Sequence, residues 1–157
     1  MSRCTTLAGV LGLAVAVTGV NAQAASRLSS IAGCYSMTVG SWSGPFPSGS
    51  ADYHQPPAII RLDTTKNVRH AEYYNVVPNV PKLGTRMLPG WHFRSPDSLG
   101  VFWSSGFAGV TLDLVVRSDS LVGTAQAFTD VMGLVQPSAP VFGVRIPCPK
   151  ELAKSAN

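Results

Sequence analysis

The sequence predicts an all-β protein, an antiparallel up-and-down barrel of about eight strands. Short runs in which apolar and polar residues alternate recur along the chain, with turn residues between them. Two cysteines bracket these runs, because Cys34 opens the first and Cys148 follows the last. A disulfide between them would tie the first strand to the last, as expected where a sheet closes on itself. The alternative is a β-sandwich.

Residues 1–24 have the pattern of a secretory signal peptide. Arg3 supplies a positive charge, Leu7–Val20 is apolar, and Ala22-Gln23-Ala24 has the small residues of a cleavage site. The apolar run is shorter than the roughly 20 residues of a membrane-spanning helix. We therefore expect a secreted or periplasmic protein without a transmembrane segment after signal removal. Residues 25–157 then form a single β-barrel domain.

The cysteines support this assignment of compartment. After removal of the signal peptide two remain, and an even number in an exported chain favours a disulfide, here Cys34–Cys148. An alternative is lipidation, because Ile31-Ala32-Gly33-Cys34 resembles a bacterial lipobox. The polar segment Asn21–Ser30 separates this motif from the apolar run, which favours the disulfide.

Eight segments carry the strand pattern. Arg69–Val77 also fits a helix, but its Tyr-Tyr pair favours a strand. We expect at most one helical turn at Ser26–Gly33, irregular chain at Val80–Gly90, a break at Pro137–Pro140 and a polar, frayed tail at Lys150–Asn157. The expected strands are Tyr35–Val39, Pro57–Asp63, Arg69–Val77, Trp91–Arg94, Leu99–Ser104, Val110–Arg117, Leu121–Phe128 and Val141–Ile146.

The strand Leu121–Phe128 bears on the barrel interior. Gly123, Ala125 and Ala127 share one face, and such small side chains leave space in a barrel core. This favours the barrel over the sandwich. Either a ligand occupies the space, or larger side chains fill it, with Trp103, Leu112 and Leu114 as candidates. The opposite face carries a potential partner surface of Phe102, Val115, Val122 and Phe128.

Short motifs resemble those of lipocalins and related calycin barrels. Gly33-Cys34-Tyr35 resembles their Gly-x-aromatic start, Thr129-Asp130-Val131 is similar to a Thr-Asp-Tyr motif without its tyrosine, and Arg145 corresponds to a late arginine. The resemblance implies that an aromatic side chain closes the barrel bottom and that a small apolar ligand binds in the barrel mouth. The layout is also similar to that of small exported bacterial proteins of unknown function.

Aromatic residues supply the candidate ligand site. Most lie in the irregular first half of the chain, and Tyr and Trp suit an apolar pocket that has a few polar groups. Alternatively, these residues only seal one end of the barrel. The candidates are Trp42, Tyr53, Tyr73, Tyr74, Trp91 and Trp103.

The sequence gives little sign of other chemistry. The net charge of +4 is scattered, which argues against nucleic-acid binding. His54, His70 and His92 lack the spacing of a metal site, so neither a metal nor a cofactor is expected. Gly40–Gly44 resembles a nucleophile elbow, but Trp42 stands in place of the serine, and no catalytic residue can be assigned.

We therefore expect an exported, non-enzymatic binding protein for a small apolar or amphipathic ligand. The alternative is an envelope structural or protein-interaction module whose barrel is filled, and the sequence identifies no protein partner. A hydrolase would require acids or histidines clustered in one cleft. An empty apolar cavity would favour the first reading, and a packed interior with an exposed surface at Phe102 and Phe128 would favour the second.

Overall fold

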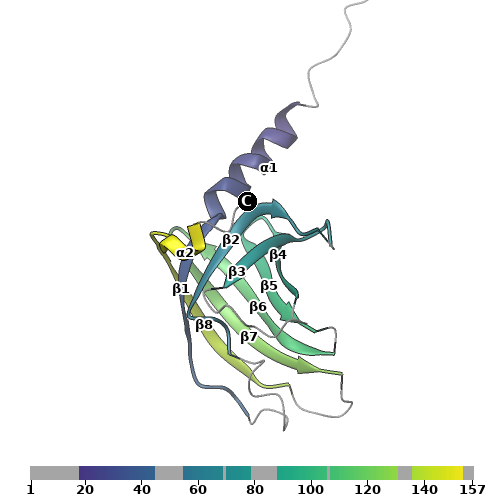
Figure 1. Ribbon diagram of the computed structural model, residues 1–157, viewed down its shortest axis with the longest axis vertical. Helices are drawn as coiled ribbons and strands as arrows, with labels where there is room; N and C mark the ends of the chain where they lie inside the picture. Colours follow the sequence, from purple (N-terminus) through teal and green to yellow (C-terminus); the bar gives the residue numbers. More distant parts are fainter. Residues whose placement is uncertain are drawn as a thin grey trace, which may run out of the picture. The chain divides into compact units, whose positions relative to one another are not determined.

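The computed structural model describes residues 18–44, 55–68, 70–78, 88–105, 107–130 and 136–153. The chain divides into two compact units, Met1–Ser30 and Ile31–Asn157, and the second contains all the strands. Figure 1 shows the elements along the chain: α1 (Thr18–Ile31), β1 (Gly33–Val39), β2 (Ile59–Lys66), β3 (Tyr74–Pro78), β4 (Leu88–Ser95), β5 (Ser98–Ser104), β6 (Ala108–Arg117), β7 (Ser120–Thr129), β8 (Ser138–Ile146) and α2 (Lys150–Ala153).

The eight strands form a closed antiparallel barrel in sequence order. Each strand pairs with the next, and β8 returns to pair with β1 from Cys34–Ile146 to Val39–Val141. Every strand therefore has a neighbour on both sides, so the sheet has no free edge. The predicted up-and-down barrel is confirmed, and the alternative sandwich is wrong.

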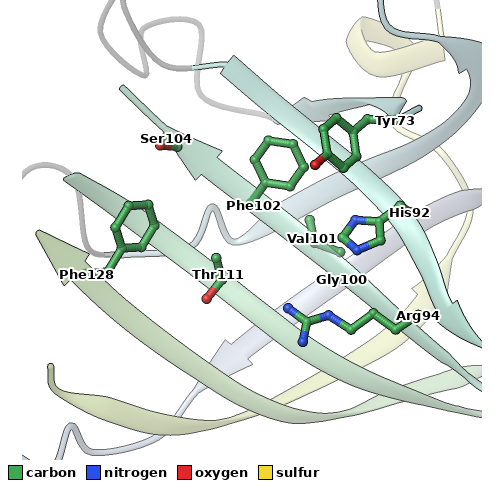
Figure 2. A pocket seen from close by; sticks show the side chains of 9 residues that line it. All are labelled: Tyr73, His92, Arg94, Gly100, Val101, Phe102, Ser104, Thr111 and Phe128. Atoms are coloured by element: carbon green, nitrogen blue, oxygen red, sulfur yellow. The ribbon is translucent and has the colours of Figure 1, made fainter. Parts of the chain in front are cut away.

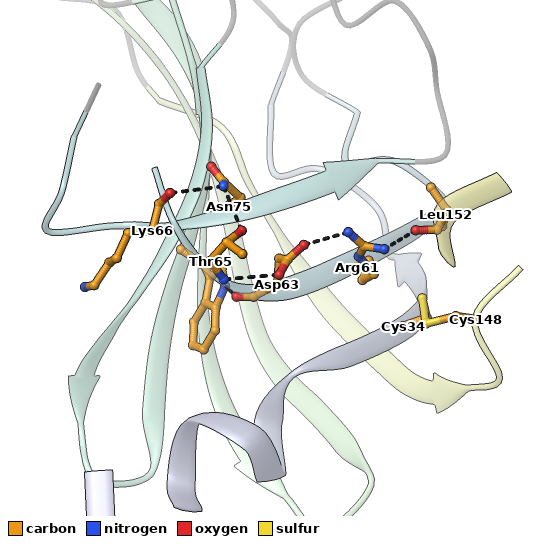
Figure 3. A network of polar contacts seen from close by, with 9 residues as sticks. Cys34, Arg61, Asp63, Thr65, Lys66, Asn75, Cys148 and Leu152 are labelled. Atoms are coloured by element: carbon orange, nitrogen blue, oxygen red, sulfur yellow. Dashed lines mark hydrogen bonds and ion pairs between the residues drawn. A yellow bond between two sulfur atoms is a disulfide. The ribbon is translucent and has the colours of Figure 1, made fainter. Parts of the chain in front are cut away.

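The predicted disulfide is also confirmed. Cys34 and Cys148 are 114 residues apart in the sequence, yet their Cα atoms are 5.1 Å apart. The bond joins the start of β1 to the chain just after β8, beside the seam where the barrel closes (Figure 3). Among the strands in the described residues, it therefore reinforces the one pairing that is not between sequence neighbours.

The chain after Cys148 is more ordered than the expected frayed tail. Residues 150–153 form α2, and its Leu152 is buried. Arg61 on β2 donates from Nη1 to the Leu152 carbonyl and from Nη2 to Asp63 Oδ2, the latter at 2.6 Å (Figure 3). The buried Leu152 side chain and the bond from Arg61 to its carbonyl hold this segment in place. The polar composition of the segment gave no sign of these contacts. Residues 154–157 lie outside the described part of the chain.

The barrel interior is packed with side chains. A row of paired residues runs across the strands from Trp91 through Val101, Leu112 and Ala125 to Ala139. All five are at most 2% exposed, so their side chains pack together at this level of the barrel. Large side chains on β4 and β5 match small ones on β7 and β8, which is how interdigitating cores reach close packing.

The expected filling residues belong to this core. Trp103 and Leu112 are 0% exposed and Leu114 is 1% exposed. Ala125 and Ala127 face the same interior, whereas Gly123 is half-buried. At these positions side chains, and not empty space, occupy the room that the small residues leave.

Near the seam the buried Tyr35 contacts the half-buried Arg145. The two residues are cross-strand partners on β1 and β8, and Arg145 Cζ lies 5.1 Å from the Tyr35 ring centroid. Tyr35 Oη donates to the Ile31 carbonyl and accepts from Arg145 Nη2, both at 2.7 Å. Burial raises the pKa of Tyr35, although the Arg145 charge opposes this. The tyrosine therefore stays protonated and can donate.

Gly33 makes room for this arginine. Its φ is +148°, and a Cβ there would lie 2.5 Å from Arg145 Nη1. A larger residue would strain the backbone and displace the guanidinium. The Gly-x-aromatic pattern thus has a local physical reason in this chain.

Several element boundaries differ from expectation, among them those of β2, which was expected at Pro57–Asp63 and spans Ile59–Lys66. The chain at His70–Tyr73 is a turn, closed by a bond from Tyr73 N to the His70 carbonyl, so β3 begins only at Tyr74. Pro140 lies within β8 because its carbonyl still accepts from Gly40 N. Leu88–Gly90 already belongs to β4, where irregular chain was expected.

The helix α1 is longer than the single turn expected. It covers Thr18–Ile31, an alanine-containing run without proline, and passes through the proposed cleavage region. The signal-peptide boundary at residue 24 stays a prediction. Of the helices in the described ranges, none has the length and apolar character needed to cross a membrane.

Replacing Cys34 and Cys148 together by serine should lower the free energy of unfolding by about 2–5 kcal/mol, because the bond closes a long loop in the unfolded chain. Denaturant titration of the parent and the double variant measures the difference. Two free thiols in the oxidised parent by mass spectrometry after alkylation would contradict the bond.

Ala125→Phe should destabilise the barrel by about 1–3 kcal/mol, because Ala125 faces Leu112 in a filled interior. Gln126→Phe is the matched control, since Gln126 is exposed and adjacent on the same strand. Thermal and denaturant unfolding of both variants tests this. Equal stability of the two variants would show that the interior has room for a phenyl ring.

Candidate binding groove

A groove lies on the outer wall of the barrel and has a volume of about 320 Å³. Strands β4 to β7 and the turn before β3 supply its walls (Figure 2). Apart from Val101, which is 0% exposed, its residues on β4 and β5 alternate with the buried Trp91 and Trp103, so they lie on the outer face. The lining residues are Tyr73, His92, Arg94, Gly100, Val101, Phe102, Ser104, Thr111 and Phe128.

Three rings form one side of the groove. The Tyr73 ring centroid lies 4.8 Å from that of Phe102 at an interplanar angle of 72°, and 5.2 Å from that of His92 at 62°. Edge-to-face pairs of this kind contribute about 0.5–1.5 kcal/mol beyond burial. Figure 2 shows the three side chains together. Each ring is therefore held by another, and the wall is formed before any ligand arrives.

Phe128 stands on the other side of the groove. Thr111 lies between Phe128 and Phe102 in Figure 2 and is the cross-strand partner of Phe102. Both phenylalanines are partly exposed, in contrast to the interior tryptophans. Two separated rings with a small hydroxyl residue between them make a slot that suits a flat apolar group.

A positive side chain forms one end of the groove. Arg94 Nη2 lies 2.7 Å from Asp113 Oδ1, and the two side chains are 47% and 51% exposed. An ion pair that is so open to solvent contributes only about 0–1 kcal/mol. The guanidinium is thus charged, accessible and weakly held.

His92 adds a titratable group between the rings and the ion pair. Its Nδ1 is buried and has no hydrogen-bond partner among the described residues. Burial lowers the pKa of His92, the nearby Arg94 charge lowers it further, and Asp113 opposes both. The imidazole is therefore neutral at neutral pH, so Arg94 supplies the positive charge of the groove.

Of the six aromatic residues predicted from the sequence, Tyr73 lines the groove. Trp91 and Trp103 are 0% exposed, and Trp91 Nε1 donates to the Asp63 carbonyl at 3.0 Å. The Tyr74 ring lies 5.0 Å from Trp91, with Lys66 Nζ 3.8 Å from its centroid. Trp42 is half-buried, after the end of β1. Tyr53 lies outside the described residues, so the structure does not bring the six together.

Sequence reasoning missed His92, Arg94 and Thr111 as groove residues. It had placed Phe102 and Phe128 on an outward face but as a partner surface. The missed signal is the alternation in Trp91–Arg94, which turns His92 and Arg94 to the face shared with Phe102. Aromatic content drew attention to the tryptophans, whereas burial decides which rings are available.

The groove does not have the composition of a metal centre. Among the residues that the structure describes, no three His, Cys, Asp or Glu side chains are close enough to hold a metal ion. His70 lies 3.7 Å from Glu72 and outside the groove lining, and His54 is not among the described residues. What the groove offers is aromatic surface, one imidazole and one guanidinium.

The chain was compared with protein-family models, curated proteins and solved structures, and none of them matches it. The fold and the site together describe the protein as a closed eight-stranded barrel with an aromatic groove on its outer wall.

The free energy of unfolding should fall as the pH is lowered below 6.5, the ordinary His92 pKa. The unfolded chain binds the proton more readily than the folded chain, so this stabilisation is complete above pH 6.5 and is lost as the pH falls through the lower folded value. Denaturant titration from pH 8 to 5 measures the slope.

His92→Phe is the comparison variant, because it keeps a ring in the cluster and cannot titrate. Its unfolding free energy should change less over the same pH range. Asp63 affects stability only at lower pH than His92. Burial raises the Asp63 pKa, but hydrogen bonds from Thr65 and Arg61 outweigh this and hold it below 3.8. Parallel pH profiles for parent and variant would show that His92 is not responsible.

Proposed function

We propose that this chain is an exported, non-enzymatic binding protein with a filled barrel, which binds a small amphipathic molecule in the outer groove. Small-molecule sites span about 300–1,000 Å³ and combine apolar surface with a few polar groups. The groove, of about 320 Å³, meets both criteria at the lower end of the range. A ligand of two or three aromatic rings suits this size.

The observation that carries the proposal is the contrast between the two faces of β5. Trp103 and Val101 face the interior and are 0% exposed, while Phe102 faces outward and is partly exposed. A ligand can reach the outer face without unpacking the core. The proposal thus moves the ligand from the barrel mouth to the barrel wall.

One interior atom favours a ligand inside the barrel, as the lipocalin resemblance implied. Trp103 Nε1 is buried without a hydrogen-bond partner among the described residues, and an unsatisfied donor costs about 1–3 kcal/mol. A ligand acceptor would satisfy it. The side chain is 0% exposed, however, so a ligand there would have to displace packed neighbours. That displacement makes the wall the better site.

Export is supported by the signal-like residues 1–24 and by the disulfide. Structural disulfides persist in oxidising compartments and are rare in the cytosol. The contact of Tyr35 with Arg145 supports a lipocalin-like relationship, because it joins residues from two of the three motifs that carry that resemblance. Under this proposal the fold is lipocalin-like and the ligand position is not.

A protein-interaction module is the second candidate, and the packed interior with Phe102 and Phe128 on the outer face is the outcome expected for it. The ligand proposal is placed first because these two rings line a groove of small-molecule size. Val122, Phe142 and Val144 are 42%, 45% and 43% exposed, and Val122 and Phe142 are cross-strand partners. A contiguous exposed apolar patch of this kind often marks a protein contact. Sedimentation equilibrium separates the candidates, since a dimer that Phe142→Ala dissociates would favour the second.

The fluorescence of uncharged N-phenylnaphthylamine should rise on binding to the parent protein, because its fused rings fit the slot. Phe102→Ala and Phe128→Ala should each weaken binding about tenfold, roughly the loss of one buried ring contact. Titration at neutral pH gives the dissociation constants, with circular dichroism to show that each variant is folded.

Phe142→Ala is the matched control, because Phe142 is an exposed phenylalanine on β8 and outside the groove. Its affinity for the probe should equal that of the parent. Equal affinities in all three variants, or no binding by the parent, would refute the groove as the binding site.

A further inference from the structure

The position of Arg94 depends on a missing side chain. Gly100 on β5 is paired with His92 on β4 and with Asp113 on β6. A Cβ at Gly100 would lie 2.8 Å from His92 Cε1 and 2.9 Å from Arg94 Nε. The arginine side chain therefore lies directly over this glycine and crosses β5 to reach Asp113. Figure 2 shows it extending past Gly100 toward the strand of Thr111.

This crossing lays the guanidinium along the end of the groove floor. A guanidinium has five N–H donors in one plane, and the contact with Asp113 uses one nitrogen. The pair is about half exposed on both sides, so solvent and other anions can compete for Arg94. Asp113 thus orients the arginine without saturating it.

The surrounding charges favour an incoming anion. The other ionisable groups near the guanidinium are His92, which lies beside it on β4, and Tyr73, whose ring contacts His92. His92 is neutral at neutral pH, because burial and the Arg94 charge lower its pKa, and Asp113 on β6 is the acid paired with Arg94. The chain also has a net charge of +4, which attracts anions from a distance.

We propose that the groove selects aromatic carboxylates and similar organic anions, whose acid group takes the place of Asp113 on Arg94 while the rings lie between Phe102 and Phe128. This rests on the proposed function and specifies its ligand class. A planar carboxylate accepts two parallel hydrogen bonds from a guanidinium, which fixes the orientation of the ligand as well as attracting it. The apolar part then extends along the slot and away from the charged end.

Two probes that share one ring system test the proposal. Anilinonaphthalene sulfonate carries an acid group, and N-phenylnaphthylamine has the same rings without it. The parent should bind the anionic probe more tightly. Arg94→Gln should weaken the anionic probe about tenfold, as expected for loss of a charge-assisted contact, and change the uncharged probe less than about twofold.

Asp113→Asn should act in the opposite direction. It removes the competing carboxylate and its repulsion, so the anionic probe should bind about threefold more tightly, which is the scale of a weak surface ion pair. Arg117→Gln is the charge-matched control, because Arg117 is exposed at the end of β6 and outside the groove lining. It should leave both affinities within about twofold of the parent.

The outcomes separate this inference from the proposed function. If Phe102→Ala still weakens the uncharged probe, but Arg94→Gln affects both probes equally or neither, the groove binds ligands and the anion preference is wrong. If Arg117→Gln lowers the affinity for the anionic probe as much as Arg94→Gln does, net charge explains the effect and the inference is overturned. If neither probe binds the parent in the groove, both proposals are wrong.

Discussion

The pairing of β1 with β8 is the constraint on which the rest of this structure depends. It joins strands from opposite ends of the domain, and the Cys34–Cys148 bond holds the same seam. Closure removes every sheet edge and fixes the interior width for eight strands, a size that side chains can fill. Trp91 and Trp103 then take the room that alanines on β7 and β8 leave. An eight-stranded barrel can be filled by side chains or hold a small ligand. Here the buried tryptophans help to fill it, which leaves the accessible groove on the outer wall.

The outer wall is shaped by the same alternation that fills the core. Each strand turns every second residue outward, so the strands that bury Trp91 and Trp103 also expose His92, Arg94 and Phe102. Gly100 has no side chain, which leaves space for the His92 and Arg94 side chains to lie over β5. A closed barrel offers no edge for strand addition, so recognition depends on side chains on the wall. The proposed ligand, a ring system with an acid group, matches what these side chains present.

The sequence sufficed for the fold because the signals that specify it are local and periodic. Alternation along Val110–Arg117 and Leu121–Phe128 identified two of the strands. The signal-like N-terminus and the positions of the two remaining cysteines identified the disulfide. The site was less predictable, since a groove arises from register between strands. Nothing in the sequence states that Gly100 pairs with both His92 and Asp113. The burial of Trp91 and the docking of Leu152 by Arg61 likewise depend on contacts between residues far apart in the chain.

Thr111 and Leu112 are sequence neighbours on opposite faces of β6, one in the groove and one in the core. This makes them a direct test of whether ligands bind outside a filled barrel. The measurement is intermolecular nuclear Overhauser effects between N-phenylnaphthylamine and methyl-labelled protein. The account predicts contacts from the probe to the Thr111 methyl group and none to Leu112 or Ala125. Contacts to Leu112 and Ala125 without contacts to Thr111 would contradict it and place the ligand inside the barrel.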